Sequence, residues 1–200
     1  EIEEVQISKP GPREVLVRPV AAGACHSDLH FVDGSYPYPL PTILGHESAG
    51  VVEEVGADVT YVKKGDHVIT CLSAFCGHCE HCITGHLSLC QSPEVSRDAE
   101  DEPRLHKGDE SIHQFLNLSS FAELMLIHEH ALVKMREDMP MDRAALIGCS
   151  TTTGVGAVFH TAGVEPGSKV AVLGCGGVGL AAINGAAIAG AGMIIAVDMV

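Results

Sequence analysis

The first 135 or so residues carry short runs of apolar and β-branched residues, separated by proline, glycine and aspartate. Runs of this length with this punctuation are typical of β-strands. We expect strands at EVLVRPVAA (14–22), AGVVEEVG (49–56), DHVIT (66–70), FAELMLI (121–127) and ALVKM (131–135). Residues 92–113 are polar and dense in charge, and we expect them to form a surface loop. The pattern as a whole predicts a β-rich first unit.

From Asp142 the pattern changes to that of helices, in DRAALIG (142–148) and TTTGVGAVFHTAG (151–163). The segment 169–198 then predicts a strand, a glycine turn, a helix and a second strand. Short apolar runs on either side of a helix suit parallel strands, which are buried on both faces. Because two strands are too few for an open parallel sheet, we expect the chain to be part of a longer protein.

The interval between Lys169 and Asp198 holds no charged residue and is long enough to cross a bilayer. It also holds seven glycines, four of them in GCGGVG, and so many glycines would disrupt a helix that faces lipid. The first residues, EIEEVQISKPGP, lack the basic and apolar regions of a signal peptide. We therefore expect no membrane partner.

The bulk composition narrows the class of protein further. The chain has 200 residues, of which 46% are hydrophobic, enough for a packed core. Its formal net charge of -14 would repel a phosphate backbone, so we exclude nucleic acid as a partner. The eight cysteines cluster in spacings typical of metal sites, which favours a reducing cytoplasm.

Four cysteines lie in the run CGHCEHCITGHLSLC, namely Cys76, Cys79, Cys82 and Cys90. Zinc binds four thiolates as a tetrahedron, and such a site has no open position, so it is structural. Disulfides are disfavoured because nothing suggests export and the loops are short, while an incidental cluster would not combine this spacing with this ligand type. The histidines of the same run are expected at the surface, since four thiolates already fill the site.

A second group of possible ligands is spread along the chain. Cys25 lies in AGACHSDLH, His46 in GHE, and Cys149 before the helix rich in glycine and threonine. Each alone has an ordinary explanation, as a buried thiol or a structural histidine. Asp28 and Glu47, however, lie close in sequence to these residues, as carboxylates that orient metal ligands do. Two thiolates and one imidazole would leave a fourth zinc position open for water or substrate.

Gly174, Gly176 and Gly179 form a GxGxxG pattern between the predicted strand KVAVL and the helix that follows. Glycines there let a pyrophosphate approach the backbone, and the helix N-terminus offers N–H groups to it. Asp198 ends the next strand, where it would bind the adenosine ribose and repel a 2′-phosphate, which favours NAD over NADP. The alternative is a glycine turn that only packs the helix on the strand.

Together these elements resemble the zinc-containing medium-chain alcohol dehydrogenases, over essentially the whole chain. The segments that carry the resemblance are GHESAGVVEEVG (45–56), the four-cysteine run and GCGGVGL (174–180). The family implies an α/β and β-rich fold: a GroES-like catalytic domain with two zinc sites, here 1–150, joined to a Rossmann (doubly wound parallel sheet) domain, here an incomplete 151–200. It also implies a homodimer or homotetramer.

The resemblance gives further residues a role. Ser27 corresponds to the hydroxyl that binds the substrate alcohol, and His30 to the histidine that ends the proton relay. Thr153 and Val178 correspond to residues at the nicotinamide, and Gly177 belongs to the glycine turn. His26 stands where many relatives have an arginine at the pyrophosphate, so we expect looser coenzyme binding.

The activity that the resemblance implies is hydride transfer from a primary or secondary alcohol, including aryl and allylic ones, to NAD. Its cofactors would be NAD and two Zn²⁺ per chain, one catalytic and one structural. One alternative is a thiol-dependent formaldehyde dehydrogenase, for which 12 lysines and arginines are few. A non-catalytic binding module with a zinc staple is the other, but it leaves Cys25, His46, Cys149 and Asp198 unexplained.

Overall fold

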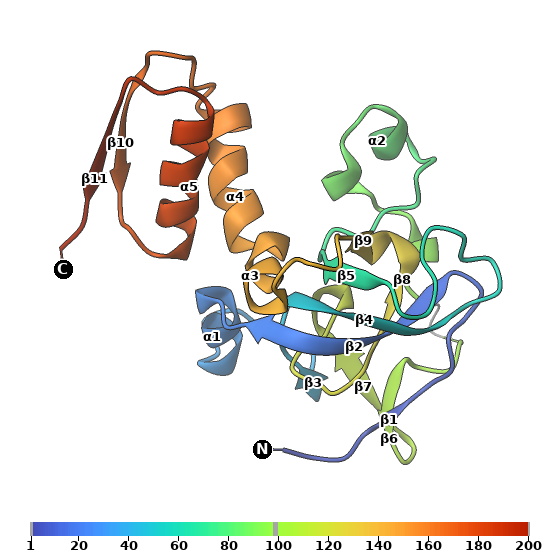
Figure 1. The fold of residues 1–200 in the computed structure, drawn as a ribbon. Helices are drawn as coiled ribbons and strands as arrows, with labels where there is room; N and C mark the ends of the chain where they lie inside the picture. Colours follow the sequence, from blue (N-terminus) through green and yellow to red (C-terminus); the bar gives the residue numbers. More distant parts are fainter. Residues whose placement is uncertain (1, 98–99, 200) are drawn as a thin grey trace. The chain divides into compact units, whose positions relative to one another are not determined.

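The computed structural model describes residues 2–97 and 100–199, and the chain forms two compact units, 1–145 and 146–200. The centre of the first unit is a five-stranded antiparallel sheet with the order β8-β2-β4-β5-β9 (Figure 1). Its strands confirm the five that the sequence predicts: β2 (Glu14–Gly23), β4 (Glu47–Val55), β5 (His67–Thr70), β8 (Met125–His128) and β9 (Leu132–Lys134).

Alternation along β2 explains why this sheet forms. Val15 and Val17 of β2 are fully buried. Arg18, the next residue of the strand, points to the exposed face and pairs there with Glu53 of β4. Buried Val52 and Val68 extend the same core from β4 and β5. The buried face of the sheet therefore supplies the main hydrophobic core of the unit.

A second sheet has the order β1-β6-β7-β3 and consists of β1 (Gln6–Ile7), β6 (Leu105–Lys107), β7 (Glu110–Gln114) and β3 (Thr42–Ile43). The prediction of a surface loop at 92–113 is wrong for β6 and β7, and residues 98–99 lie outside the described part. Leu105 and Ile112 are buried opposite each other, which anchors a hairpin whose other residues are polar. Two inward apolar residues are too few to reveal these strands in a sequence dominated by charged residues.

Short helices connect the strands of the first unit: α1 (His26–Val32), α2 (Glu80–Ile83) and α3 (Met141–Ala145). Single 3-10 turns lie at Leu87–Leu89, Pro93–Val95, Phe115–Asn117 and Glu129–Ala131. α1 follows β2 directly, and β4 begins at Glu47. The end of β2 and the start of β4 are paired, Gly23 with Glu47, so the residues on both sides of this pair come together.

The second unit begins with a 3-10 turn at Leu146–Gly148 and α4 (Ser150–Gly156), which runs on into a π-helical turn at Ala157–Thr161. β10 (Lys169–Leu173), α5 (Gly177–Ile188) and β11 (Met193–Val197) then form a βαβ unit with parallel strands, as predicted. A side chain at Gly154 would meet the backbone oxygen of Val178 at 2.4 Å, so α4 and α5 pack closely.

Across the described residues, no helix combines the length and apolar character needed to cross a membrane.

Candidate metal and coenzyme sites

The four thiols of the cysteine-rich lobe lie together, as the sequence predicts (76, 79, 82 and 90). The sulfur of Cys79 lies 3.5 Å from that of Cys82 and 3.8 Å from that of Cys90, and the sulfurs of Cys76 and Cys82 are 3.9 Å apart. With zinc–sulfur bonds of about 2.3 Å, the edge of a tetrahedron is about 3.8 Å. The spacing of these donors therefore fits a zinc ion.

Backbone N–H groups support negative charge on this cluster. The amides of His78 and Cys79 donate to Cys76 Sγ, at 3.5 and 3.3 Å. Burial opposes ionisation of Cys76, but these amides outweigh it and lower the pKa of its thiol to about 6. At Cys82 burial and the neighbouring thiols raise the pKa to about 11. Four close thiols cannot all ionise without a cation between them, and a divalent zinc would supply that charge.

The three histidines of the lobe stay outside the four-sulfur cluster. His78 and His86 are exposed, and His78 Nε2 lies 2.8 Å from Glu94 Oε1. His81 is half-buried within α2. His78 and Glu94 do form a small group with Cys76, but Cys76 already belongs to the four-sulfur cluster.

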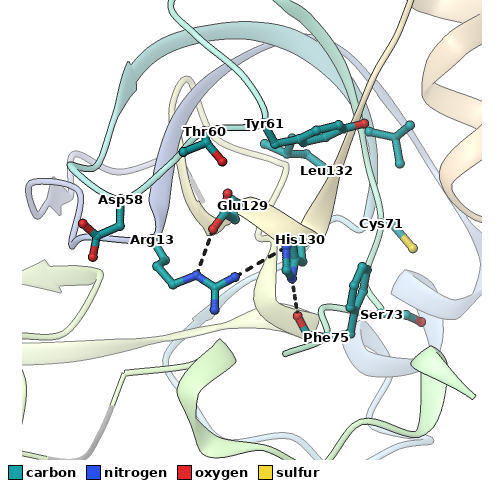
Figure 2. Close-up of a pocket in the computed structure, with 11 residues that line it drawn as sticks. Arg13, Asp58, Thr60, Tyr61, Cys71, Ser73, Phe75, Glu129, His130 and Leu132 are labelled. Carbon is teal, nitrogen blue, oxygen red and sulfur yellow. Dashed lines mark hydrogen bonds and ion pairs between the residues drawn. The ribbon is translucent and has the colours of Figure 1, made fainter. Parts of the chain in front are cut away.

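Residues outside the lobe hold its entry in place, which sequence reasoning missed (Figure 2). His130 Nδ1 donates to the carbonyl of Phe75, the residue before Cys76, at 2.7 Å, and the two rings stack at 4.5 Å. Arg13 lies 3.5 Å from His130 Nε2 and pairs with the buried Glu129 at 2.8 Å. The contact between His130 and Phe75 joins the start of the lobe to the turn between β8 and β9. It lies beside a pocket of about 560 Å³.

A second cluster forms in the first unit where β2 ends and β4 begins. Cys25 Sγ, a ring nitrogen of His46 and a carboxylate oxygen of Glu47 lie within 4.8 Å of one another. His46 and Glu47 are 1% and 2% exposed, so the cluster is nearly closed to solvent on their side. Thiolate, imidazole and carboxylate are all zinc ligands. Glu47 is thus close enough to be a ligand, beyond the supporting role expected for it.

Asp28, which is 5% exposed, organises this cluster. Its Oδ1 lies 3.1 Å from His46 Nδ1 and accepts the N–H of Gly45 at 3.1 Å, while Oδ2 accepts the N–H of Cys25 at 3.1 Å. A carboxylate oxygen can only accept, so Nδ1 carries the proton and Nε2 keeps its lone pair. The arrangement is the one that metal-binding histidines require.

Two glycines make room for the cluster, and their need could be recognised only from the structure. A Cβ at Gly23 would lie 2.1 Å from Glu47 Oε2 and 3.1 Å from Glu47 Cβ. Gly45 has φ of +96°, and a Cβ there would meet the backbone nitrogen of Phe121 at 2.6 Å. A side chain at Gly23 would therefore displace the carboxylate of Glu47, and Gly45 excludes a side chain through both its φ and the nearby backbone.

The remaining predicted residues of this region lie on α1. Ser27 and His26 are exposed, and His30 is half-buried, with its ring edge-on to that of His26 at 4.8 Å. Tyr36 contacts His30 from another side, at 5.1 Å. His30 Nδ1 is buried and has no hydrogen-bond partner among the described residues. The helix therefore places a hydroxyl and two imidazoles directly after Cys25.

In the second unit, Cys149 is half-buried and immediately precedes α4, and Thr153 is exposed within that helix. The glycine turn after β10 has the geometry that a phosphate cradle needs. Gly174 has φ of +93°, and a Cβ at Gly174 or Gly176 would meet nothing within 4 Å, so the space over the turn is open. A Cβ at Gly179, by contrast, would lie 1.8 Å from the oxygen of Gly174.

α5 begins directly after this turn, at Gly177, and Val178 is exposed in its first turn. Asp198 follows β11, and its Oδ2 accepts the N–H of Cys175 inside the turn at 2.5 Å. The open glycine turn, the helix N-terminus and a carboxylate after the next strand fit a dinucleotide such as NAD.

The sheets and the two metal-ligand clusters of the first unit are those of an alcohol dehydrogenase GroES-like domain. The family model with that description matches residues 11–137. The chain belongs to the zinc-containing medium-chain alcohol dehydrogenase family. Zinc and NAD are typical of this family.

Individual relatives have different printed activities. The chain is 40% identical to an NDMA-dependent alcohol dehydrogenase of Amycolatopsis methanolica, over 100% of this chain and 55% of that protein. It is 41% identical to an S-(hydroxymethyl)glutathione dehydrogenase of Saccharomyces cerevisiae, over 99% and 53%. The structure of benzyl alcohol dehydrogenase from Acinetobacter calcoaceticus matches with a TM-score of 0.89 and 38% identity, over 100% and 55%. The chain thus spans about half the length of the curated relatives it matches.

Proposed function

We propose that the protein is an NAD-dependent zinc alcohol dehydrogenase that oxidises primary or secondary alcohols, aryl alcohols included, to aldehydes or ketones. The observation that carries the proposal is the cluster of Cys25, His46 and Glu47 with its buried Asp28. A protein that uses zinc only to stabilise its fold does not need this second buried cluster of metal ligands with a carboxylate that orients its histidine. The likeness to a benzyl alcohol dehydrogenase supports the aryl class of substrate.

In this proposal Cys25, His46 and Cys149 hold the catalytic zinc, while cysteines 76, 79, 82 and 90 hold a structural one. Bound zinc would act as a Lewis acid on the alcohol oxygen, and bound NAD would accept the hydride. Asp28 keeps the proton on His46 Nδ1 and so presents Nε2 to the metal. The chain itself thus fixes the orientation and the tautomer of His46.

The chain also offers a route for the proton that the alcohol loses. Ser27 would take up this proton as it releases its own hydroxyl proton, and His30 would pass a proton on toward solvent. The half-buried ring of His30, with Nδ1 free of protein partners among the described residues, suits a group that must exchange protons. His26 would contact the pyrophosphate of the coenzyme, which is the role that the family resemblance gives it.

For the coenzyme, we propose that Gly174, Gly176, Gly177 and Gly179 bind the pyrophosphate and that Thr153 and Val178 contact the nicotinamide. Asp198 would bind the ribose, which favours NAD over NADP. We further propose a cytoplasmic homodimer or homotetramer, with a small alcohol or aldehyde as substrate.

The test is NADH formation by the full-length protein with a panel of aliphatic and aryl alcohols, run beside formaldehyde plus a low-molecular-weight thiol. Turnover of the alcohols without thiol supports the proposal. Activity that requires the thiol would replace it with thiol-dependent formaldehyde dehydrogenase, an alternative supported by the likeness to the S-(hydroxymethyl)glutathione dehydrogenase. Inactivity in both assays, together with one zinc per chain, would favour a non-catalytic zinc module.

A further inference from the structure

Two histidines lie on one face of α1, the helix that follows β2 (Figure 1). His26 and His30 are four residues apart, and side chains at this separation are neighbours on the surface of a helix. The centres of their rings are 4.8 Å apart. Two imidazoles four residues apart on a helix also supply two of the metal ligands of zinc proteases. The pair is therefore a candidate for a metal site outside the two clusters of the first unit.

The distance between the two rings fits one ion held between them. With metal–nitrogen bonds of about 2.1 Å, the centres of two imidazoles on one ion lie about 4.6 Å apart at a bond angle of about 90° and about 5.3 Å apart at a tetrahedral angle. The observed 4.8 Å falls inside this interval. The planes of the rings meet at 72°, so one ring has to turn to point both nitrogens at the ion. His26 is exposed, and the ring torsion of a histidine is soft.

His30 is the more fixed member of the pair. Its ring is half-buried, and the ring of Tyr36 packs against it at 5.1 Å from another side. The N–H of Tyr36 donates to the carbonyl of His30 at 3.0 Å, which holds the two residues together. Nδ1 of His30 is buried, whereas Nε2 is not closed off in this way. Nε2 is therefore the nitrogen of His30 that an ion can reach.

A carboxylate near the pair favours a cation. Asp33 directly follows α1 and is exposed. The pKa of Asp33 is lowered first by its hydrogen bonds with Ser35 and then, more weakly, by the nearby rings of His30 and His26. The same carboxylate would attract a metal ion bound between these rings. It is not close enough to both of them to be a third ligand, so water would complete the coordination.

We propose that His26 and His30 together bind a further divalent transition-metal ion, of the class that prefers imidazole ligands, such as Ni²⁺ or Zn²⁺. Among the described residues, nothing accepts a hydrogen bond from Nδ1 of His30. Such an acceptor raises the affinity of a metal-bound histidine about 10- to 100-fold. The ion is therefore held weakly and exchanges with the solvent, unlike the zinc ions proposed for the cysteine clusters.

An ion at this site would affect the proton relay. In the proposed function His30 passes a proton on toward solvent, and a metal ion on Nε2 occupies the lone pair that this step needs. An excess of the ion should therefore slow alcohol oxidation. This consequence rests on the proposed function, whereas the metal site itself rests only on the arrangement of the two rings.

The experiment is a calorimetric titration of the zinc-loaded full-length protein with Ni²⁺ at pH 7.5 or about that value, without NAD. We expect one nickel ion per chain to bind while the zinc content, measured by elemental analysis, stays constant. Because Ni²⁺ is paramagnetic, the ring resonances of His26 and His30 should broaden before those of the other histidines. Nickel binding only with loss of zinc would mean that the ion enters a cysteine cluster, and it would overturn the proposal.

Substitutions identify the ligands. His26→Gln and His30→Gln each remove one imidazole, so we expect nickel affinity to fall at least tenfold in both. His26 is exposed, and its substitution leaves the core untouched. The exposed His113→Gln on β7 is the matched control and should bind like the wild type. His78 lies 2.8 Å from Glu94 and forms the competing surface pair. Unchanged affinity in H26Q, or a loss in His78→Gln instead, would overturn the proposal.

Initial rates of alcohol oxidation test the consequence separately. We expect the activity of the wild type to fall over the same range of Ni²⁺ concentration in which the ion binds. Binding at His26 and His30 without inhibition would contradict the place of His30 in the proton relay and leave the metal site standing. Absence of binding would overturn the metal site and leave the proposed function untouched.

Discussion

Asp28 Oδ1 lies 3.1 Å from His46 Nδ1, and the other oxygen of this carboxylate accepts the N–H of Cys25. One buried side chain therefore joins α1 to the start of β4 and sets the tautomer of the imidazole at the metal cluster. The carboxylate thus holds two candidate ligands at once: Cys25 through its main-chain N–H and His46 through its ring.

We therefore expect Asp28→Asn to weaken zinc binding at the Cys25–His46 cluster by about 10- to 100-fold. The reason is that an amide NH₂ would face an N–H of Cys25 or of the His46 ring, where the carboxylate now accepts. The measurement is zinc content after dialysis against a graded chelator, with the four-cysteine zinc as an internal reference. Asp33→Asn, at the exposed end of α1, is the control and should keep both ions. Full zinc retention by D28N would contradict the role given to this carboxylate.

In the four-cysteine lobe, Cys79→Ser should remove one zinc per chain and lower the unfolding temperature by about 10 °C or more, because a structural zinc contributes directly to folding. Cys79 is the informative position, since its sulfur contacts those of both Cys82 and Cys90. Elemental analysis and a thermal melt measure the two effects. Cys71→Ser, a half-buried thiol outside the lobe's cluster, should retain both zincs. Equal zinc loss in the two variants would mean that the lobe does not hold the ion.

A pair of substitutions in the glycine turn distinguishes a coenzyme site from a packing motif. Gly176→Ala adds a methyl group where nothing lies within 4 Å, so the protein should fold normally but bind NADH at least tenfold more weakly. Gly179→Ala puts Cβ 1.8 Å from the oxygen of Gly174, so it should destabilise the unit itself. Fluorescence titration with NADH and thermal melts measure these outcomes. If G176A binds NADH like the wild type, the turn serves only to pack α5 on β10.

The features that could be predicted from the sequence are those in which residue type and local spacing determine the outcome. The four cysteines of the lobe lie within one loop, and the glycine pattern between β10 and α5 is equally local. The strands of the five-stranded sheet also carry enough consecutive apolar residues to be recognised.

The features that were missed depend on partners distant in sequence. The hairpin β6–β7 lies in a stretch dominated by charge, and Arg104 is buried there only because Glu14, on β2, accepts from it. Gly23 is required by the side chain of Glu47, which reaches it through strand pairing. His130 supports the lobe through the carbonyl of Phe75. No spacing rule connects these residues before the fold brings them together.

The lowered pKa of His128 predicts how the stability of the protein depends on pH. Its pKa is lowered from 6.5 to about 4, first by burial and then by Arg13, so the unfolded chain binds a proton in this interval that the folded one does not. Stability from this group is therefore complete above pH 6.5 and is lost as the pH falls toward 4. Between pH 7 and pH 4.5 we expect the wild type to lose about 2 kcal/mol more unfolding free energy than His128→Gln, whose side chain does not titrate.

The measurement is urea unfolding of both proteins at the two pH values and at the same ionic strength. Any acid loss of zinc occurs in both proteins, so the difference between their pH dependences isolates His128. His113→Gln, on the exposed side of β7, is the matched control and should follow the wild type. Parallel pH dependences for the wild type and H128Q would show that His128 keeps an ordinary pKa in the folded protein.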